Sequence, residues 1–490
     1  MRLAELCKEI EYELIQGSLE TQVKDLIYDS RKLKKDTAFF CMVGAVTDGH
    51  RYITDAIQKG ASVIVVERTD DIPQIPKTMT VIKVPSARKA LAYMSAAFFG
   101  YPAKEMTMIG LTGTKGKTTT TYMIKGVLEE AGKKVGLIGT IGALIGEEKL
   151  ASKNTTPESY ELHKMFREMA DAGCEYVVME VSSQGLKMDR TAGIQFQYGV
   201  FTNLSPDHIG PTEHASVEEY MACKSLLFRQ CDVGIVNIDD KNWEQVLKDH
   251  TCTLKTYSME KEADLWATKI GFIREYGKLG MRFTANGVMN GEIKVHIPGR
   301  FNVYNALVCV MVAKLAGIEE KAIVNGLSKV QVKGRVELVP VSGNFHIIID
   351  YAHNELSTRS VLNTLQEYHP NHMMCVFGGG GNRSKLRRYD MGEVCGEMAD
   401  LCVLTCDNPR DEEIKDINND IKVGLEKSHG KYIEIDDRKE AIAYCIEHAE
   451  PGDMIVLLGK GHEDYQEIKG VKYHFDEREA IAEIMADMNA

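Results

Sequence analysis

The chain has 490 residues, too many for one hydrophobic core, so roughly two to four domains are expected. Hydrophobic residues make up 44% and charged residues 27% of the chain, as in ordinary soluble globular proteins. The formal net charge of −12 argues against a general binder of nucleic acid or of anionic membranes, so anionic substrates would need local basic pockets.

The first region, residues 1–100, alternates short apolar runs such as ASVIVVE with helical stretches, and closes with the linker-like FFGYPAKEM. Its beginning, MRLAELCKEIEYE, lacks the apolar core of a signal peptide. The longest apolar stretch of the chain, ALVCVMVAKLAG, is interrupted by Lys314 and is too short to span a bilayer. The 12 cysteines show no zinc-binding spacing. We therefore expect a cytoplasmic protein with reduced thiols and no membrane insertion.

A candidate phosphate loop, GTKGKTT, lies between the strand-like run MTMIGL and the helical stretch TTTYMIKGVLEE. Gly110, Gly113 and Gly116 let the backbone turn tightly so that N–H groups can face an anion, and the helix N-terminus adds partial positive charge. Lys117 can then reach the outer phosphates, and the Thr118 hydroxyl can ligate Mg²⁺. The usual pattern also has a glycine five positions before Gly116, where this chain has leucine. The loop indicates a nucleotide, but it does not separate a kinase, a hydrolase and a ligase.

Further apolar runs follow up to about residue 333, namely KKVGLIGT, EYVVMEV, YGVFTNL and VGIVNID, with helices between several of them. This alternation predicts a mostly parallel, doubly wound sheet. EYVVMEVSS puts Glu180 at the end of a strand, where its carboxylate could hold Mg²⁺ opposite Thr118; a strand-end glutamate in solvent is an equally good interpretation. FTNLSPDHIG offers Asp207 and His208, although a lone histidine is more often structural.

From about residue 334 onward, strand-like runs again precede polar loops, and ligands gather at the carboxyl ends of parallel strands. The polar residues after three of these runs are Asp350, Tyr351 and His353; Asp407, Asn408 and Arg410; and Gly459, Lys460, His462 and Glu463. Each loop alone could be turn chemistry, but three together predict a binding site. The basic run GGGGNRSKLRR has no interleaved aromatic residues, which favours a solvated loop over a nucleic-acid patch.

Ten motifs in order resemble the Mur ligase family, and within it the MurE type: GTKGKTT, NTTPE, EVSSQGL, FTNLSPDH, EEYMACKSLLF, GRFNVYNAL, GRVE, DYAH, DNPR and GKGHEDYQ. The segment YDSRKLKKDTAFFCMVGAVTDGHRYI is similar to that family's uridine-nucleotide domain. The resemblance covers essentially the whole chain. It implies an α/β protein with three domains: a small α/β domain for the UDP-substrate (1–100), a central P-loop doubly wound domain for ATP (101–333), and a Rossmann-like domain for the amino acid (334–490).

The resemblance also implies a reaction. The γ-carboxylate of D-glutamate on UDP-MurNAc-L-Ala-D-Glu would be phosphorylated from ATP to an acyl phosphate, which the amine of a third amino acid would attack. DNPR resembles the signature of enzymes that add meso-diaminopimelate, whose distal carboxylate suits a bidentate guanidinium. Arg410 and Arg388 would hold that carboxylate. The implied cofactors are ATP, Mg²⁺ and a CO₂-derived carbamate on Lys224, the expected partners are the substrates, and a monomer is expected.

The family pattern assigns site residues to this sequence. Those implied in catalysis are Lys117, Glu180, His208 and Lys224, and the metal ligands would be Thr118, Glu180, His208 and carbamylated Lys224. ATP would be bound by Gly113, Thr114, Lys115, Gly116, Lys117, Thr118, Thr119, Asn305, Arg335 and Asp350. The UDP-substrate would be bound by Tyr28, Ser30, Ala45, Val46, Thr47, Asn154, Thr155, Thr156, Ser182, Met188 and Arg190. The amino acid would be bound by Arg388, Asp407, Asn408, Pro409, Arg410, Gly459 and Glu463.

Several segments around the implied substrates depart from the common family pattern, among them DHIGPTEHAS, DYAHNELST and GGGGNRSKLRRYDMGE, and Met188 stands where a glutamine often contacts the dipeptide. One alternative is therefore a related ligase that adds L-lysine or another amine, or uses another acceptor such as a folate. An alternative of another class is a P-loop ATP hydrolase or a nucleotide-gated binding module. A strict requirement for an added amine would exclude that second alternative.

Overall fold

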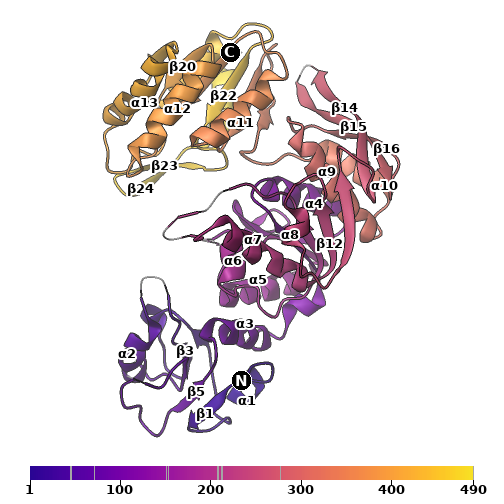
Figure 1. The fold of residues 1–490 in the computed structure, drawn as a ribbon. Helices are drawn as coiled ribbons and strands as arrows, with labels where there is room; N and C mark the ends of the chain where they lie inside the picture. The colour runs from indigo at the N-terminus through magenta and orange to yellow at the C-terminus, as the bar shows by residue number, and fades with distance from the viewer. Residues whose placement is uncertain are drawn as a thin grey trace. The chain divides into compact units, whose positions relative to one another are not determined.

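The computed structural model describes residues 1–44, 47–70, 72–150, 152, 154–206, 209–210, 213–275 and 277–488. The helices and strands of the fold are drawn in Figure 1. The chain divides into two compact units. The first comprises Met1–Trp266 and Val308–Ile323, and the second comprises Ala267–Leu307 and Val324–Ala490.

The first unit begins with a five-stranded sheet of order β1-β5-β4-β3-β2, in which only β1 is antiparallel to its neighbour. Its strands are β1 (Glu13–Gln16), β2 (Leu26–Ile27), β3 (Ala38–Phe40), β4 (Val63–Val66) and β5 (Thr80–Lys83). The helices of this part are α1 (Leu3–Leu6), α2 (Ile53–Gln58) and α3 (Ala87–Phe98). Strands β3 and β4 are buried along their whole length, because a parallel sheet covered on both faces has no solvent face.

The larger sheet of the first unit has the order β13-β12-β11-β6-β10-β7-β8-β9. Its strands are β6 (Thr107–Thr112), β7 (Val135–Gly139), β8 (Gly142–Ile145), β9 (Glu148–Leu150), β10 (Tyr176–Glu180), β11 (Phe196–Phe201), β12 (Cys231–Asn237) and β13 (Thr253–Ser258). The intervening helices are α4 (Lys117–Glu130), α5 (Ser159–Asp171), α6 (Ser183–Lys187), α7 (Val217–Ser225) and α8 (Trp243–Val246). All neighbours from β13 to β7 are parallel, whereas β8 and β9 extend the edge as antiparallel strands. The sheet is therefore mixed, with a parallel centre.

The second unit contains strands β14 (Leu265–Glu275, beginning in the first unit), β15 (Lys278–Gly287) and β16 (Gly291–Val295). The residues of helices α9 (Phe301–Leu315) and α10 (Glu320–Lys329) are divided between the two units. A six-stranded sheet of order β17-β18-β22-β19-β20-β21 follows, with only β17 antiparallel. Its strands are β17 (Glu337–Val339), β18 (His346–Asp350), β19 (Met373–Phe377), β20 (Leu401–Leu404), β21 (Tyr432–Glu434) and β22 (Met454–Leu458), and a separate hairpin is formed by β23 (Tyr465–Ile468) and β24 (Val471–His474).

Helices cover both faces of this six-stranded sheet. They are α11 (Glu355–Gln366), α12 (Lys385–Met398), α13 (Ile414–Ser428), α14 (Arg438–Glu447) and α15 (Glu477–Met488). Ile348 of β18 packs with residues of α11, α12 and α13, which lie side by side in Figure 1, whereas Ile347 and Ile349 pack with α14 and α15. Successive strand residues point to opposite faces, so a continuous apolar run serves both layers. The Rossmann-like architecture predicted for the C-terminal region is confirmed.

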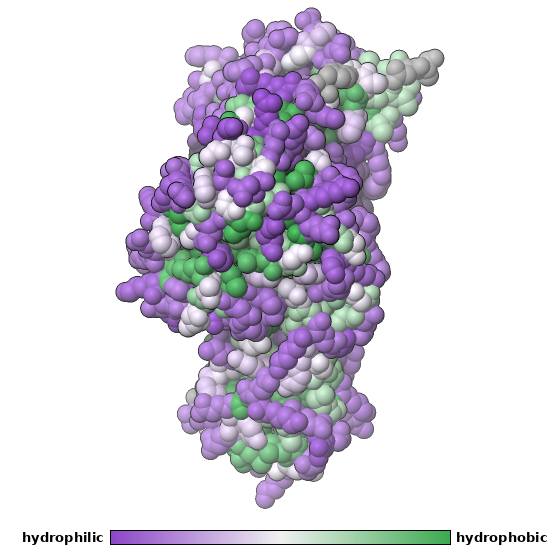
Figure 2. Space-filling model, turned by 90° about the vertical axis from the view of Figure 1, so that its right-hand side faces the viewer, coloured by the Kyte–Doolittle hydropathy of each residue, from purple (hydrophilic) through white to green (hydrophobic). Residues whose placement is uncertain are grey.

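The α/β class predicted from the sequence is confirmed throughout. Hydrophilic residues dominate the face drawn in Figure 2, with apolar residues interspersed, as the charged fraction of 27% leads one to expect. Over the part of the chain that the structure describes, no helix combines the length and apolar character needed to cross a membrane.

Candidate functional site

The candidate phosphate loop joins β6 to α4, as its pattern predicts. Gly113 and Gly116 have φ angles of +146° and +86°, which residues with a side chain rarely adopt. A Cβ on Gly113 would lie 2.0 Å from Thr202 Oγ1, so the loop also has no room for a side chain there. Gly116 is the N-cap of α4 and supplies no side-chain cap, which leaves the helix N-terminus shaped for an anionic ligand.

Glu180 lies at the end of β10, where it is 1% exposed, and its carboxylate contacts the first turn of α4 and the residue after β7. Thr118 Oγ1 donates to Glu180 Oε1 (2.9 Å), so the two residues predicted to share Mg²⁺ are in direct contact. Thr140, directly after β7, donates its N–H to Oε1 (2.9 Å) and its hydroxyl to Oε2 (3.2 Å). A Cβ on Gly139 would lie 2.4 Å from Glu180 Oε1, so a side chain at this position would have to displace the carboxylate.

These donors fit a magnesium site in chemical type. Mg²⁺ prefers oxygen ligands, and the Thr118 hydroxyl and Glu180 carboxylate supply them. Asp207 and His208 lie outside the described residues. Among the residues that are described, no group of three or more His, Cys, Asp or Glu side chains could hold a metal ion. Thr118 and Glu180 are thus the part of the predicted ligand set that the structure brings together.

Lys224, in α7, is 1% exposed and points at the phosphate loop. Its Nζ donates to the Gly113 carbonyl (2.9 Å) and lies 4.3 Å from the centre of the Tyr220 ring. Lys117 Nζ donates to the same carbonyl (2.7 Å) and to that of Thr114 (3.1 Å). Two predicted catalytic lysines therefore converge on one carbonyl of the loop, where their charge would attract an anion.

The phosphate loop is also bonded to Tyr220 and Asn203, two residues to which the sequence pattern assigns no role. Thr114 Oγ1 is 3.1 Å from the Tyr220 hydroxyl, and Lys115 N donates to Asn203 Oδ1 (2.9 Å). The sequence pattern also assigns no role to Thr140, which contacts Glu180. Its sequence signal is a polar residue directly after an apolar run, in KKVGLIGT, which is the signal that pointed to Glu180.

Part of the predicted UDP-substrate set gathers at the carboxyl end of β10. Thr156 Oγ1 donates to the Glu180 carbonyl (2.9 Å) and accepts from Ser182 N (3.0 Å). Arg190 Nη1 donates to the Thr156 carbonyl (3.0 Å), and Thr155 Oγ1 is 3.1 Å from Thr140 Oγ1.

The remaining predicted substrate residues are more dispersed. The Tyr28 hydroxyl donates to the carboxylate of Glu161 (2.9 Å), and Thr47 Oγ1 is 3.3 Å from the Tyr52 hydroxyl. Ser30 opens a 3₁₀ turn, Asn154 is exposed, and Met188 is the C-cap of α6. Ala45 and Val46 lie outside the described residues.

In the second unit, the predicted ATP residues Arg335 and Asp350 lie close enough for their charges to interact. Asp350, at the end of β18, accepts the backbone N–H groups of Val336 (2.7 Å) and Ala352 (2.8 Å). Burial nonetheless raises the pKa of the Asp350 carboxyl, against the opposing charge of Arg335. Asn305, in α9, donates to Asn302 Oδ1 (2.8 Å).

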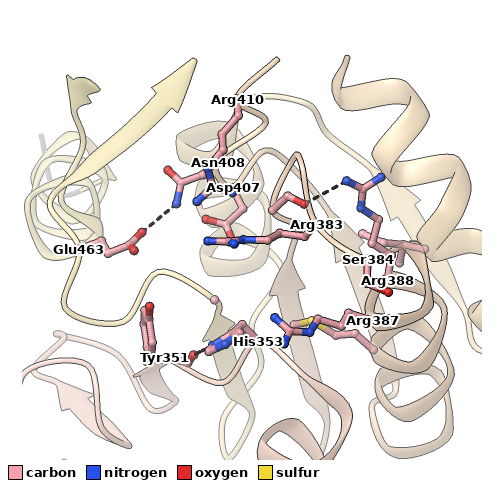
Figure 3. A pocket seen from close by; sticks show the side chains of 16 residues that line it. Tyr351, His353, Arg383, Ser384, Arg387, Arg388, Asp407, Asn408, Arg410 and Glu463 are labelled. Carbon is pink, nitrogen blue, oxygen red and sulfur yellow. Dashed lines mark hydrogen bonds between the residues drawn. The ribbon is translucent and has the colours of Figure 1, made fainter. Parts of the chain in front are cut away.

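A cavity of about 250 Å³ opens at the carboxyl ends of β19, β20 and β22 (Figure 3). Six of the seven residues predicted to bind the amino acid line it: Arg388, Asp407, Asn408, Arg410, Gly459 and Glu463. Pro409 lies between Asn408 and Arg410, and its carbonyl oxygen would be 1.8 Å from a Cβ on Gly381. The glycine run GGGG thus lets two loops approach closely. Arg383 and Arg387 also line the cavity. They belong to the basic run GGGGNRSKLRR, for which the sequence favours a solvated loop.

Both signs of charge meet in this cavity. Asn408 Nδ2 donates to Glu463 Oε2 (2.8 Å), and the fully buried Lys460 lies 3.5 Å from the carboxylates of both Asp407 and Glu463. Arg410 has a left-handed backbone (φ +49°) and donates from Nη1 to the Gly381 carbonyl (2.7 Å). The walls can therefore pair with ammonium and carboxylate groups of one ligand.

Arg388 is held by the chain's own acids. Its guanidinium donates to Glu412 (2.8 Å), to Asp420 (2.8 Å) and to the Gly380 carbonyl (3.0 Å). The hydrogen bonds from Arg388 lower the pKa of Glu412 to about 2. Its predicted contact with a ligand carboxylate stays a prediction.

Comparisons with known proteins agree with this arrangement. Three family models match: "Mur ligase family, catalytic domain" over residues 22–99, "Mur ligase middle domain" over 111–313, and "Mur ligase, glutamate ligase domain" over 334–461. The chain is similar to the UDP-N-acetylmuramoyl-L-alanyl-D-glutamate–2,6-diaminopimelate ligases of Clostridium tetani (42% identity over 491 residues, 100% of both chains) and Clostridium perfringens (43% over 492 residues, 99% of both).

Solved structures show the same architecture. One of a ligase with the same name has a TM-score of 0.72 at 26% identity, covering 100% of this chain and 99% of that one. MurF from Acinetobacter baumannii, at 20% identity, shares the fold with a TM-score of 0.61 over 99% and 98% of the two chains. The chain therefore belongs to the Mur ligase family of ATP-dependent ligases and has its three-domain α/β fold.

Proposed function

We propose that this protein adds meso-diaminopimelate to the D-glutamate γ-carboxylate of UDP-MurNAc-L-Ala-D-Glu, through an acyl phosphate, in the synthesis of peptidoglycan precursors. The observation that carries the proposal is the cavity of the second unit, where Arg410 of the DNPR motif lies with Asp407, Asn408 and Glu463. Diaminopimelate has an ammonium and a carboxylate at each end, and the cavity walls offer groups of both signs. The relatives named above carry this activity in their names.

Different residues of the chain would bind the phosphates, the metal ion and the amino acid. Lys117 and the N–H groups of the phosphate loop would hold the phosphates, and Thr118, Glu180 and His208 would hold Mg²⁺. ATP, which this family uses with Mg²⁺, would supply the phosphoryl group, and Mg²⁺ would neutralise the charge of its oxygens. Asp407 and Glu463 would hold an ammonium group of the amino acid, while Arg410 holds its distal carboxylate. Arg335 and Asp350 stay predicted ATP contacts.

We also propose domain boundaries near residues 100 and 333, supported by three family matches that fall on either side of them. The protein would work as a cytoplasmic monomer. Sedimentation of the purified protein tests the monomer.

The test of the function is phosphate release with ATP, Mg²⁺ and UDP-MurNAc-L-Ala-D-Glu, with meso-diaminopimelate, L-lysine or no amine in parallel. Turnover with meso-diaminopimelate alone is expected. Turnover with L-lysine instead would show that the enzyme adds another amine. Phosphate release without any amine would favour the hydrolase, and release only with a folate acceptor would overturn the muramyl substrate.

The carbamate on Lys224 is a separate proposal, supported by the burial of Nζ beside the phosphate loop. The Lys224 ammonium would first lose a proton, and neutral Nζ would then add to the carbon of CO₂ and release a second proton, so that a cation becomes an oxygen ligand for Mg²⁺. Lys224→Ala is expected to lose at least ~100-fold in kcat, and added acetate or formate should restore part of it. Lys125→Ala, which removes another buried lysine paired with Glu129, is the control and should need no carboxylate. Full activity of Lys224→Ala would end the proposal.

Gly139 offers a second test of the metal site. In Gly139→Ala the new methyl group overlaps Glu180 Oε1, the atom that accepts from Thr118, so the carboxylate must leave its present position. The Mg²⁺ concentration for half-maximal activity is expected to rise about tenfold, which corresponds to about 1.4 kcal/mol. Gly136→Ala in the same strand is the control, because the atoms nearest to its methyl group belong to Met169 and not to Glu180. Equal Mg²⁺ requirements in the two variants would contradict the role given to Glu180.

A further inference from the structure

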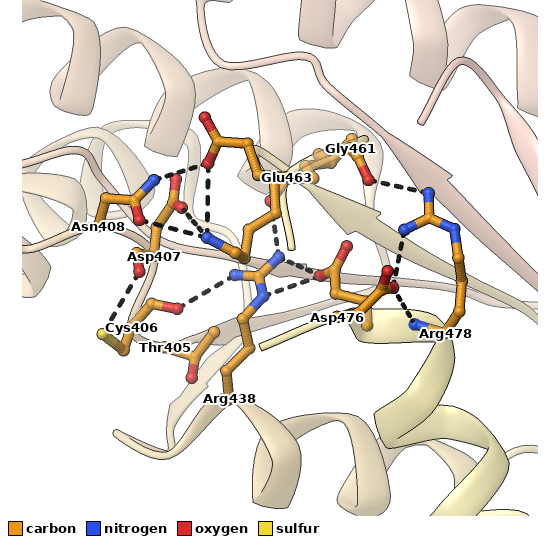
Figure 4. A network of polar contacts seen from close by, with 12 residues as sticks. Thr405, Cys406, Asp407, Asn408, Arg438, Gly461, Glu463, Asp476 and Arg478 are labelled. Atoms are coloured by element: carbon orange, nitrogen blue, oxygen red, sulfur yellow. Dashed lines mark hydrogen bonds and ion pairs between the residues drawn. The ribbon is translucent and has the colours of Figure 1, made fainter. Parts of the chain in front are cut away.

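A buried ion pair contacts the loops that form the amino-acid cavity, and its arginine, Arg438, is labelled in Figure 4. Arg438 is the first residue of α14 and Glu477 the first of α15, and they are 1% and 0% exposed. Arg438 Nε and Nη2 donate to Glu477 Oε1 at 2.9 and 2.7 Å. Neither side chain is among those that line the cavity, so the pair has no direct access to a ligand there.

The same guanidinium also bonds to both cavity loops. Nη1 donates to the carbonyl of Cys406 (3.3 Å), directly before Asp407, and Nη2 donates to the carbonyl of Leu458 (2.9 Å), directly before Gly459. Those loops follow β20 and β22, which are not neighbours because β19 lies between them. Strands separated by one other lie about 10 Å apart, and the Arg438 guanidinium spans this gap by bonding to one carbonyl on each side.

The spacing of these loops matters for the cavity. The Asn408–Glu463 hydrogen bond (2.8 Å) and the Lys460–Asn408 contact (3.3 Å) each join one loop to the other. A Cβ on Gly459 would be 2.8 Å from Asp407 Oδ2, so the loops are already in close contact at this point. A small displacement of either loop would separate groups that must face one ligand together.

We infer that Arg438, anchored by Glu477, is a positioning residue that fixes the Asp407–Asn408 loop relative to the Gly459–Glu463 loop and thereby sets the affinity for the amino acid. The inference rests on the amino-acid site proposed above. The planar fork of arginine is needed, because two carbonyls and one carboxylate are bonded at once. Lysine keeps the charge but is a single point donor, so it can hold one loop and lose the other.

The test compares Arg438→Lys with Asp453→Asn. Asp453 is equally buried (2% exposed), but it precedes β22 at the opposite end, where it accepts from the N–H groups of His372 and Glu450. Arg438→Lys is expected to raise the KM for the amino acid at least tenfold, with the KM values for ATP and for the UDP-substrate within twofold of wild type. Asp453→Asn should lower Tm without a selective change in KM. Glu477→Gln, which keeps the shape of the pair, should act like Arg438→Lys but less strongly.

An unchanged amino-acid KM in Arg438→Lys, or equal rises in all three KM values for both variants, would overturn the inference. Hydrogen exchange of the two loops provides a readout that needs no substrate. Faster exchange in residues 406–410 and 459–463 of Arg438→Lys than of Asp453→Asn is expected, and equal exchange would overturn the positioning role. A wild-type enzyme that uses no amine would instead refute the proposed function and leave this exchange result standing.

Discussion

Lys117→Met is expected to lower kcat/KM by more than ~10³-fold, the largest single effect that the site predicts. Lys117 Nζ lies inside the phosphate loop, 2.7 Å from the carbonyl of Gly113 and 3.1 Å from that of Thr114. A phosphate bound there would exchange these weak carbonyl acceptors for charged oxygens. Charge that develops during phosphoryl transfer is stabilised by fixed cations in a site shielded from water, and methionine supplies the length of lysine without the charge.

The measurement is steady-state phosphate release under the full substrate set, with thermal unfolding to verify the fold. Lys133→Met is the control, since Lys133 pairs with Glu175 on the surface at 2.9 Å and such pairs contribute little. We expect its activity within twofold of wild type. If Lys117→Met kept a tenth or more of the activity, the loop could not be the phosphate site.

The parts of the fold and site that the sequence predicts are those with a local signal. The loop from Gly113 to Gly116, and Glu180 opposite Thr118, follow from an apolar strand that ends in a polar residue. Parallel strands place their carboxyl ends at one edge, which is why Asp407 and Glu463, far apart in sequence, line one cavity. The antiparallel β8 and β9 have no such signal and were not expected in a parallel sheet.

Long-range pairing of charges is what the sequence does not reveal. Arg438 and Glu477 stand at helix starts in charged stretches, where exposed side chains are the ordinary expectation. Their burial depends on a contact across 39 positions. The same holds for Arg388, whose guanidinium is bonded to Glu412 and Asp420. These acids come close to Arg388 only when α12 packs against α13.

Arg410→Ala is expected to raise the KM for meso-diaminopimelate between ~10- and ~100-fold, since a hydrogen bond to a charged group contributes about 1.5–3 kcal/mol. The side chain is fixed before any ligand arrives, by its bond to the Gly381 carbonyl and by Glu467, whose carboxylate accepts from Nε at 3.1 Å. Little side-chain entropy is therefore lost when a carboxylate binds. Arg410→Lys should recover only part of the affinity, because an ammonium cannot form the bidentate pair.

The effect should depend on the amine, and this is the sharper test. L-lysine lacks the distal carboxylate, so any slow turnover with it should be unchanged or faster in Arg410→Ala. The ratio of kcat/KM for the two amines would then fall by the full ~10- to ~100-fold. Lys422→Ala, which breaks a peripheral pair with Glu434 at 2.7 Å, is the control and should leave the ratio unchanged. A variant of Arg410 that lost both amines equally would show that this arginine shapes the cavity, through Gly381 and Glu467, without reading the distal carboxylate.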